Sequence, residues 1–299
     1  MTTPATDTLN GAIDAVAGNP VIVFDTSVVN HLFDDPQRER LLVSLAETRH
    51  VYLGFIVADE LFATRSPERR KALLGLCCDL VEPDGSHLLM PDDEMLKHMI
   101  EQFDTTRAIY PMQSLRALKN FREAIASEEI TGDDATSAQA RVFNREKREQ
   151  FERAITEVKG KFFSAFSDLS GDPVETVSRL EDGGHVRALA RSLYEKVAVN
   201  PINDEELDWF LEHCPPFKAL LIAIAVAQHE RFVGHRFAEC SKKPAGQSDL
   251  YQALLLPYCH EFCMQDNPFR EAFSTIVRIL NYQTRILSYG DLRAELLEA

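Results

Sequence analysis

The chain has 299 residues, of which 45% are hydrophobic and 26% are charged. This composition is that of a globular protein with one or two hydrophobic cores, and it excludes collagen-like, mucin-like and mostly disordered chains. The formal net charge of −15 argues against a general nucleic-acid coat or a binder of anionic membranes. It still allows a nucleic-acid enzyme, because such an enzyme needs only a local basic surface.

The sequence shows no sign of export or of membrane insertion. Residues 1–20 contain no Lys or Arg and no continuous apolar stretch, so they do not resemble a secretory signal. The most apolar segment, residues 219–227, is too short to span a bilayer and is expected to form a buried helix. The six cysteines form no CxxC pair and no disulfide framework. We therefore predict reduced thiols, a cytoplasmic location and no membrane association.

Apolar runs without alternation mark the first part of the predicted core. Residues 21–24 (VIVF) and 51–57 (VYLGFIV) are expected to be strands buried on both faces, because apolar residues follow one another without polar interruption. Residues 88–90 are expected to form a short third strand. Helical spacing of apolar residues follows each strand, as at 92–103. This alternation predicts a parallel sheet covered by helices.

The remainder of the chain divides into a helical stretch and a second α/β stretch. Between 103 and 238, helical periodicity dominates and strand signals are nearly absent. The predicted elements that follow are a helix at 249–258, a strand at 260–264, a helix at 269–280 and a strand at 284–288. The simplest architecture is an α/β core formed by residues 1–102 and 239–299, interrupted by a mostly α-helical insertion at 103–238.

Four acids lie at or near the predicted ends of strands. Asp25 and Asp266 follow two of the strands, Glu60 lies just past the second strand, and Asp249 begins a helix. Because the carboxyl ends of parallel strands form a ligand crevice, these acids are candidates to converge. Converging carboxylates repel one another unless a cation neutralises them, and oxygen ligands suit Mg²⁺ or Mn²⁺. Taken singly, each acid also fits a helix N-cap or a turn.

Four segments and a closing strand resemble PIN-domain (PIN-like) nucleases in their order along the chain. They are VIVFDTSVV at 21–29, IVADEL at 56–61, SDLYQALLLPY at 248–258, FCMQDNPF at 262–269 and RILSY at 285–289. The resemblance covers about 20–100 and 240–290, and it implies a Rossmann-like α/β/α sandwich with a divalent-metal ribonuclease site. The catalytic and metal-binding carboxylates that it implies are Asp25, Glu60, Asp249 and Asp266, supported by the hydroxyl of Thr26 or Ser27.

The chain departs from that family pattern in three places. Met264 stands where the family often has Thr, two residues before the last acid. Asp59 adjoins Glu60, so the second ligand could be displaced by one residue. The long helical segment also distinguishes the chain from small toxin-type members, so we do not expect a simple toxin–antitoxin role.

Basic residues that could contact RNA lie mainly in the helical segment and just before the third acid. Three of them step by three residues and share one face of a predicted helix. A second cluster at 141–148 has interleaved glutamates and equally fits a solvated helix face. The candidate phosphate contacts are Arg116, Lys119, Arg122, Lys242 and Lys243.

The sequence as a whole predicts a Mg²⁺- or Mn²⁺-dependent endoribonuclease that hydrolyses RNA phosphodiester bonds at four carboxylates. Two alternatives stay open. One is a PIN-like scaffold that has lost its chemistry and binds RNA or protein, and the other is a nuclease that acts on single-stranded or flap DNA. A homo-oligomer and an inhibitor or antitoxin protein are both compatible with the sequence, although no segment indicates either interface.

Overall fold

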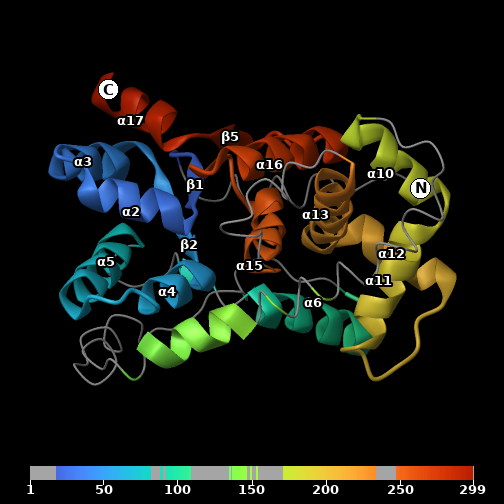
Figure 1. The fold of residues 1–299 in the computed structure, drawn as a ribbon. Coiled ribbons are helices and arrows are strands. Elements are labelled where there is room, and N and C mark those ends of the chain that lie inside the picture. Colours follow the sequence, from blue (N-terminus) through green and yellow to red (C-terminus); the bar gives the residue numbers. More distant parts are fainter. Residues whose placement is uncertain are drawn as a thin grey trace.

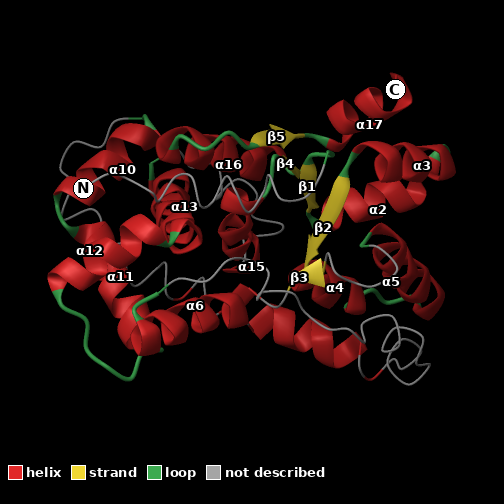
Figure 2. Ribbon diagram, turned by 180° about the vertical axis from the view of Figure 1, so that it is seen from behind, coloured by secondary structure: helices red, strands yellow, loops and turns green. Residues whose placement is uncertain are grey.

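The computed structural model describes residues 18–81, 88–89, 92–108, 135, 137–146, 149, 153, 171–233 and 247–298. Its centre is a parallel sheet with the strand order β3-β2-β1-β4-β5 (Figures 1 and 2). The strands are β1 (Val21–Phe24), β2 (His50–Gly54), β3 (Leu88–Leu89), β4 (Glu261–Cys263) and β5 (Arg285–Leu287). The order reverses between β1 and β4, so two segments more than 200 residues apart lie side by side at the centre.

Both faces of the sheet are covered by helices, which confirms the predicted α/β class with a parallel sheet. In β1, Ile22 and Phe24 belong to one hydrophobic core, and Val21 and Val23 belong to the other. All four side chains are buried, as the uninterrupted apolar run predicts. The helices on the Ile22 side are α2 (Thr26–Asp34), α3 (Arg38–Thr48), α4 (Phe55–Phe62), α5 (Pro67–Leu80) and α17 (Tyr289–Glu298).

The opposite face carries a thicker helical layer (Figure 1). Against the sheet lie α6 (Asp92–Thr106), α15 (Gln247–Tyr251), the 3₁₀ helix η2 (Gln252–Tyr258) and α16 (Asn267–Leu280). Farther along the layer are α10 (Pro173–Asp182), α11 (His185–Glu195), α12 (Asp204–His213) and α13 (Pro215–Phe232). Helix α13 packs on both η2 and α16, and its side chains join the same core as Val21 and Val23. The helical segment is therefore continuous in packing with the sheet, and the predicted boundary at 102/103 falls within α6.

Two predicted elements differ from the structure at their ends. The strand predicted at 51–57 ends at Gly54, and Ile56 and Val57 belong to α4. The apolar run continues past the strand because Val57 is buried on the face of α4 that packs against the core. An apolar run by itself does not distinguish such a buried helical turn from a strand. The helix predicted at 249–258 consists of α15 and the 3₁₀ helix η2, which contains Pro257.

Local sequence signals account for where several helices begin and end. Asp25, Asp172 and Asp266 are N-caps whose carboxylates accept backbone N–H bonds, and α16 has Pro in its first turn. Asn203 forms a capping box with Glu206 at the start of α12. Asn281 ends α16 in the left-handed conformation, with φ of 54°, so it serves the role that Gly often has at this position.

Among the described residues, no single helix combines the length and the apolar composition required to cross a bilayer. Helices α12 and α13 meet that criterion only when taken together, and they are bent by 95° relative to each other.

Candidate functional site

The candidate site lies at the carboxyl ends of β1 and β4, where the order of the strands reverses. Phe24 and Cys263 are partners in the last register position of these two strands. The chain beyond Phe24 turns into α2, and the chain beyond Cys263 turns into α16. In open parallel sheets, the point of reversal is where the loops of two strands diverge and leave a ligand crevice.

Asp25 is the first residue after β1 and is partly buried. Its backbone N–H donates to the carbonyl of Cys263 at 3.1 Å, so the residue is tied to the neighbouring strand. Its carboxylate oxygen Oδ1 accepts from the hydroxyl of Ser27 at 2.6 Å and from the N–H of Val28 at 2.9 Å. Asp25 is therefore an N-cap, as a purely structural interpretation requires, and its orientation is set by three hydrogen bonds.

The electrostatics of Asp25 go beyond those of an ordinary N-cap. Burial raises its pKa from 3.8 to about 6, the hydrogen bonds from Ser27 and Val28 oppose this rise, and the charge of Glu60 adds to it. Glu60 lies on the second turn of α4, which follows β2, the neighbour of β1 in the sheet. The structure thus brings together two of the four predicted carboxylates from adjacent strand ends.

Ser27 connects the two strand ends that border the site. Its Oγ donates to Asp25 and accepts from the backbone N–H of Gln265 at 3.1 Å. The side chain of Gln265 in turn accepts from the N–H of Tyr289 at 3.3 Å, just beyond β5. Ser27 is therefore the hydroxyl that supports Asp25. The Oγ1 of Thr26 is buried and has no hydrogen-bond partner among the described residues.

The other two predicted acids, Asp266 and Asp249, lie at the start of one helix and within another. Asp266 is exposed and caps α16, where its carboxylate accepts from the N–H of Phe269 at 3.4 Å. Asp249 is partly buried on α15. The charge of Glu60 contributes to the raised pKa of Asp25. Across the same residues, no three His, Cys, Asp or Glu side chains gather closely enough to hold one metal ion.

The predicted RNA contacts are only partly within the described chain. Of the second basic cluster, Arg141 donates to the carbonyl of Ala63 at 3.3 Å and to Ser137 at 2.5 Å. Arg145 pairs with Glu149 at 3.8 Å across one helical turn. Arg141 thus attaches helical residues 137–146 to the chain just past α4. The residues that lie outside the described chain are Arg116, Lys119, Arg122, Lys242 and Lys243.

Two residues beside the site were not among the sequence predictions. Gln265 connects the ends of three strands, and Arg270 lies in the first turn of α16. Burial raises the pKa of the Cys263 thiol at the end of β4; the negative charges of Asp25 and Asp291 add to this rise, and the positive charge of Arg270 opposes it. The available sequence signal was position alone, because Gln265 and Arg270 lie two and seven residues beyond the end of the fourth strand.

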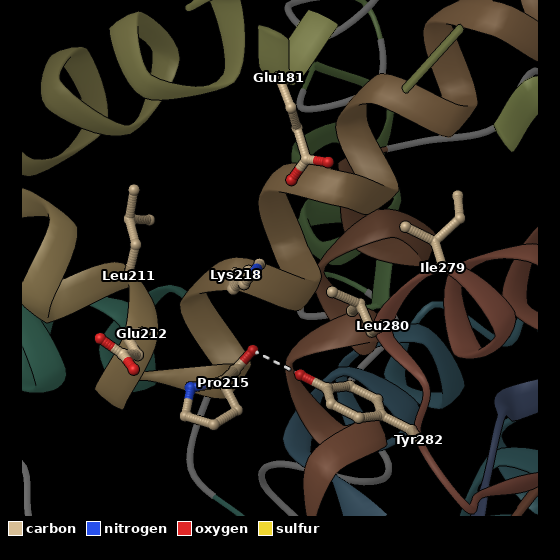
Figure 3. A pocket seen from close by; sticks show the side chains of 8 residues that line it. All are labelled: Glu181, Leu211, Glu212, Pro215, Lys218, Ile279, Leu280 and Tyr282. Atoms are coloured by element: carbon tan, nitrogen blue, oxygen red, sulfur yellow. Dashed lines mark hydrogen bonds between the residues drawn. The ribbon is translucent and has the colours of Figure 1, made fainter. Parts of the chain in front are cut away.

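A separate pocket lies at the far end of α16, about 20 Å along the helix from Asp266. Its volume is about 250 Å³. Figure 3 shows Glu181 reaching towards it from α10, and the hydroxyl of Tyr282 donating to the carbonyl of Pro215 at 3.1 Å. The residues around it are Glu181, Leu211, Glu212, Pro215, Lys218, Ile279, Leu280 and Tyr282. None of the predicted site residues lines this pocket.

In comparisons with known proteins, no family model, no curated protein and no solved structure matches the chain.

Proposed function

We propose that the protein is a divalent-metal-dependent nuclease of the PIN-like kind that hydrolyses phosphodiester bonds in RNA. The observation that carries the proposal is the placement of Asp25. It lies at the point where the strand order reverses, it is partly buried, and its pKa is raised to about 6 by burial and by Glu60. A perturbed carboxylate in such a position is typical of a functional site.

The chemistry of this carboxylate pair fits a hard divalent cation. Two neighbouring carboxylates that raise each other's energy when ionised are stabilised by a positive charge between them. Mg²⁺ is commonly held by one or two carboxylates together with water and substrate phosphate, so the pair of Asp25 and Glu60 is a sufficient protein contribution. When bound there, Mg²⁺ or Mn²⁺ would make a bound water more acidic and stabilise charge on the attacked phosphate.

The side chains of the site would orient the carboxylates, and none of them would itself attack the phosphorus atom. Ser27 and Val28 hold Asp25 in one orientation, so the carboxylate is preorganised before substrate arrives. Gln265 keeps the end of β4 against β1 through its hydrogen bond to Ser27. No nucleophilic side chain is required, because water attacks phosphorus in hydrolysis.

Asp249 and Asp266 remain in the proposal as further ligands from the same edge of the sheet. Asp266 lies three residues beyond Cys263, the last residue of β4. Asp249 is on α15, which leads through η2 to the start of β4.

Cleavage of matched RNA and DNA oligonucleotides with Mn²⁺, and with EDTA in its place, tests the proposal. We expect Mn²⁺-dependent cleavage of RNA that is lost in Asp25→Asn and in Glu60→Gln. The control Glu101→Gln changes an exposed residue of α6 that pairs with Lys97 across one turn, and it should retain full activity.

The other outcomes would contradict the proposal in recognisable ways. Cleavage of the DNA strand alone would establish the DNA-nuclease alternative. RNA binding without cleavage under any metal condition would establish the scaffold alternative. Calorimetric Mn²⁺ binding that survives in the Asp25→Asn/Asp249→Asn double variant would place the metal elsewhere.

A further inference from the structure

Arg270 lies at the start of α16, close to the carboxyl end of β4. Its backbone N–H donates to the carbonyl of the N-cap Asp266 at 2.9 Å, so it belongs to the first turn of the helix. That turn follows β4 directly, and β4 lies between β1 and β5. Arg270 is partly buried.

The guanidinium of Arg270 forms no hydrogen bond and no ion pair within the part of the chain that the structure describes. Other arginines near the sheet are engaged: Arg49 pairs with Glu261 at 3.1 Å, and Arg293 pairs with Asp35 at 2.7 Å. The positive charge of Arg270 contributes to lowering the pKa of Asp291. That carboxylate instead accepts from the hydroxyl of Ser288 at 2.5 Å and from its backbone N–H at 3.2 Å.

Asp25 directly follows β1, and Arg270 lies in the first turn of the helix that follows the neighbouring strand β4. The charges of both act on the thiol of Cys263, and they act in opposite directions. Cys263 ends β4, and its carbonyl accepts the N–H of Asp25. The carboxyl ends of β1, β2 and β4 are thus followed by two carboxylates, Asp25 and Glu60, and by a cation, Arg270, that is unengaged among the described residues.

This arrangement matches the two needs of a phosphodiester at a metal-assisted site. The carboxylates suit the cation, and a guanidinium presents N–H donors in a planar fork that fits two phosphate oxygens. Four acids lie at or near the same edge of the sheet: Asp25, Glu60, Asp266 and Asp291. A fixed positive charge among them reduces the repulsion that an approaching RNA strand would meet.

We propose that Arg270 binds a phosphate of the RNA strand at the carboxylate site and is thereby a substrate-contacting residue of the nuclease. The proposal rests on the proposed function, since it assigns the phosphate contact of that same site. This phosphate contact on α16 would add to the RNA contacts that the sequence suggested in the basic segments.

The test compares Arg270→Ala and Arg270→Lys with Arg278→Ala in the full chain. Arg278 is on the same helix two turns farther on, is exposed, and lies 4.0 Å from Asp172, so it controls for loss of one positive charge from α16. Binding of a fluorescent RNA oligonucleotide is measured by anisotropy in EDTA over a range of KCl concentrations. Steady-state cleavage is measured separately in Mn²⁺, and thermal unfolding by circular dichroism verifies that each variant is folded.

We expect Arg270→Ala to weaken RNA binding about tenfold and to reduce the slope of log Kd against log salt by about one. KM should rise more than kcat falls, because the contact exists before the reaction. Arg270→Lys should keep the salt slope and recover part of the affinity, since lysine retains the charge without the planar fork. Arg278→Ala should behave as wild type.

The possible failures are distinguishable. If wild type cleaves RNA with Mn²⁺ but Arg270→Ala keeps the wild-type Kd and salt slope, the phosphate contact is wrong and the nuclease proposal stands. The same conclusion follows if Arg278→Ala weakens binding as strongly as Arg270→Ala, because the effect is then one of overall charge. If wild type neither binds nor cleaves RNA, the proposed function fails and this inference fails with it.

Discussion

The substitution Asp25→Asn is expected to stabilise the metal-free protein at neutral pH while it abolishes activity. Asn is as good an N-cap as Asp, and its amide oxygen can accept the bonds from Ser27 and Val28. What it removes is a partly buried negative charge next to Glu60. Stability and activity should therefore change in opposite directions, as they do where a site is strained for function.

The magnitude follows from the pKa of Asp25, which is 3.8 for an ordinary aspartate and about 6 in the folded protein. Because the folded-state value is the higher one, the folded protein binds more protons than the unfolded chain between these two pH values. The unfolding free energy contributed by this group therefore falls as pH rises from about 4 to about 6. The loss is about 3 kcal/mol at pH 7 and less than about 1 kcal/mol at pH 4.

Urea unfolding in EDTA at pH 4, 5, 6 and 7 measures this difference between wild type and Asp25→Asn. The advantage of the variant should grow with pH up to about pH 7 and then level off. Asp266→Asn is a matched control, since Asp266 also caps a helix after a strand but is exposed. Its replacement should change stability little at any of these pH values.

Two results would refute the reasoning. If Asp25→Asn is less stable than wild type at pH 7, then hydrogen bonds to the ionised carboxylate outweigh the cost of burying it. If its advantage is the same at pH 4 and pH 7, the difference does not arise from ionisation of Asp25.

Three further predictions concern the core around β4. Glu261→Gln should lower the unfolding free energy by about 3 kcal/mol in urea titrations, because a buried carboxylate that pairs with two arginines is replaced. As a control, Glu101→Gln removes a charge from an exposed pair and should change the unfolding free energy by less than about 0.5 kcal/mol. Phe262→Ala should cost about 3–5 kcal/mol in the same assay, since the ring is fully buried and packs on a second phenylalanine; a loss below about 1 kcal/mol would contradict that packing. In a Cys240→Ser background, Ellman's reagent at pH 8 should label Cys263 and the other buried thiols only on unfolding, because burial protects these thiols and raises the pKa of Cys263. Rapid labelling of the native protein would show instead that the thiols are accessible.

Much of the fold could be predicted from apolar patterning. The uninterrupted apolar run at 21–24 is a strand buried on both faces, and the short runs near 88, 261 and 285 are also strands. For β1 and β4 the prediction succeeded because every residue of these strands is buried, and burial on both faces leaves a direct trace in composition. The strand at 51–57 was predicted too long, because Val57 is buried from a helix as completely as a strand residue would be.

The positions of the acids were also evident from the sequence, but their electrostatics were not. That Asp25 follows a buried strand is visible in VIVFD, and so is its capacity to cap the next helix. Its raised pKa depends on how much protein surrounds it and on Glu60, which is 35 positions away in the chain. Desolvation and charge act through space, so no local pattern contains them.

Arg270 illustrates the same division. Its place one turn after the last acid can be read from the chain, whereas its lack of a partner among the described residues is visible only in the structure, where Asp291 bonds to Ser288. The continuity of the helical segment with the sheet likewise depends on α13 packing on η2 and α16. Sequence patterns record which side chains are buried and where elements begin, because those preferences are local. Which charges meet, and which are left unpaired, is set by the order of the strands and by packing between segments distant in the chain.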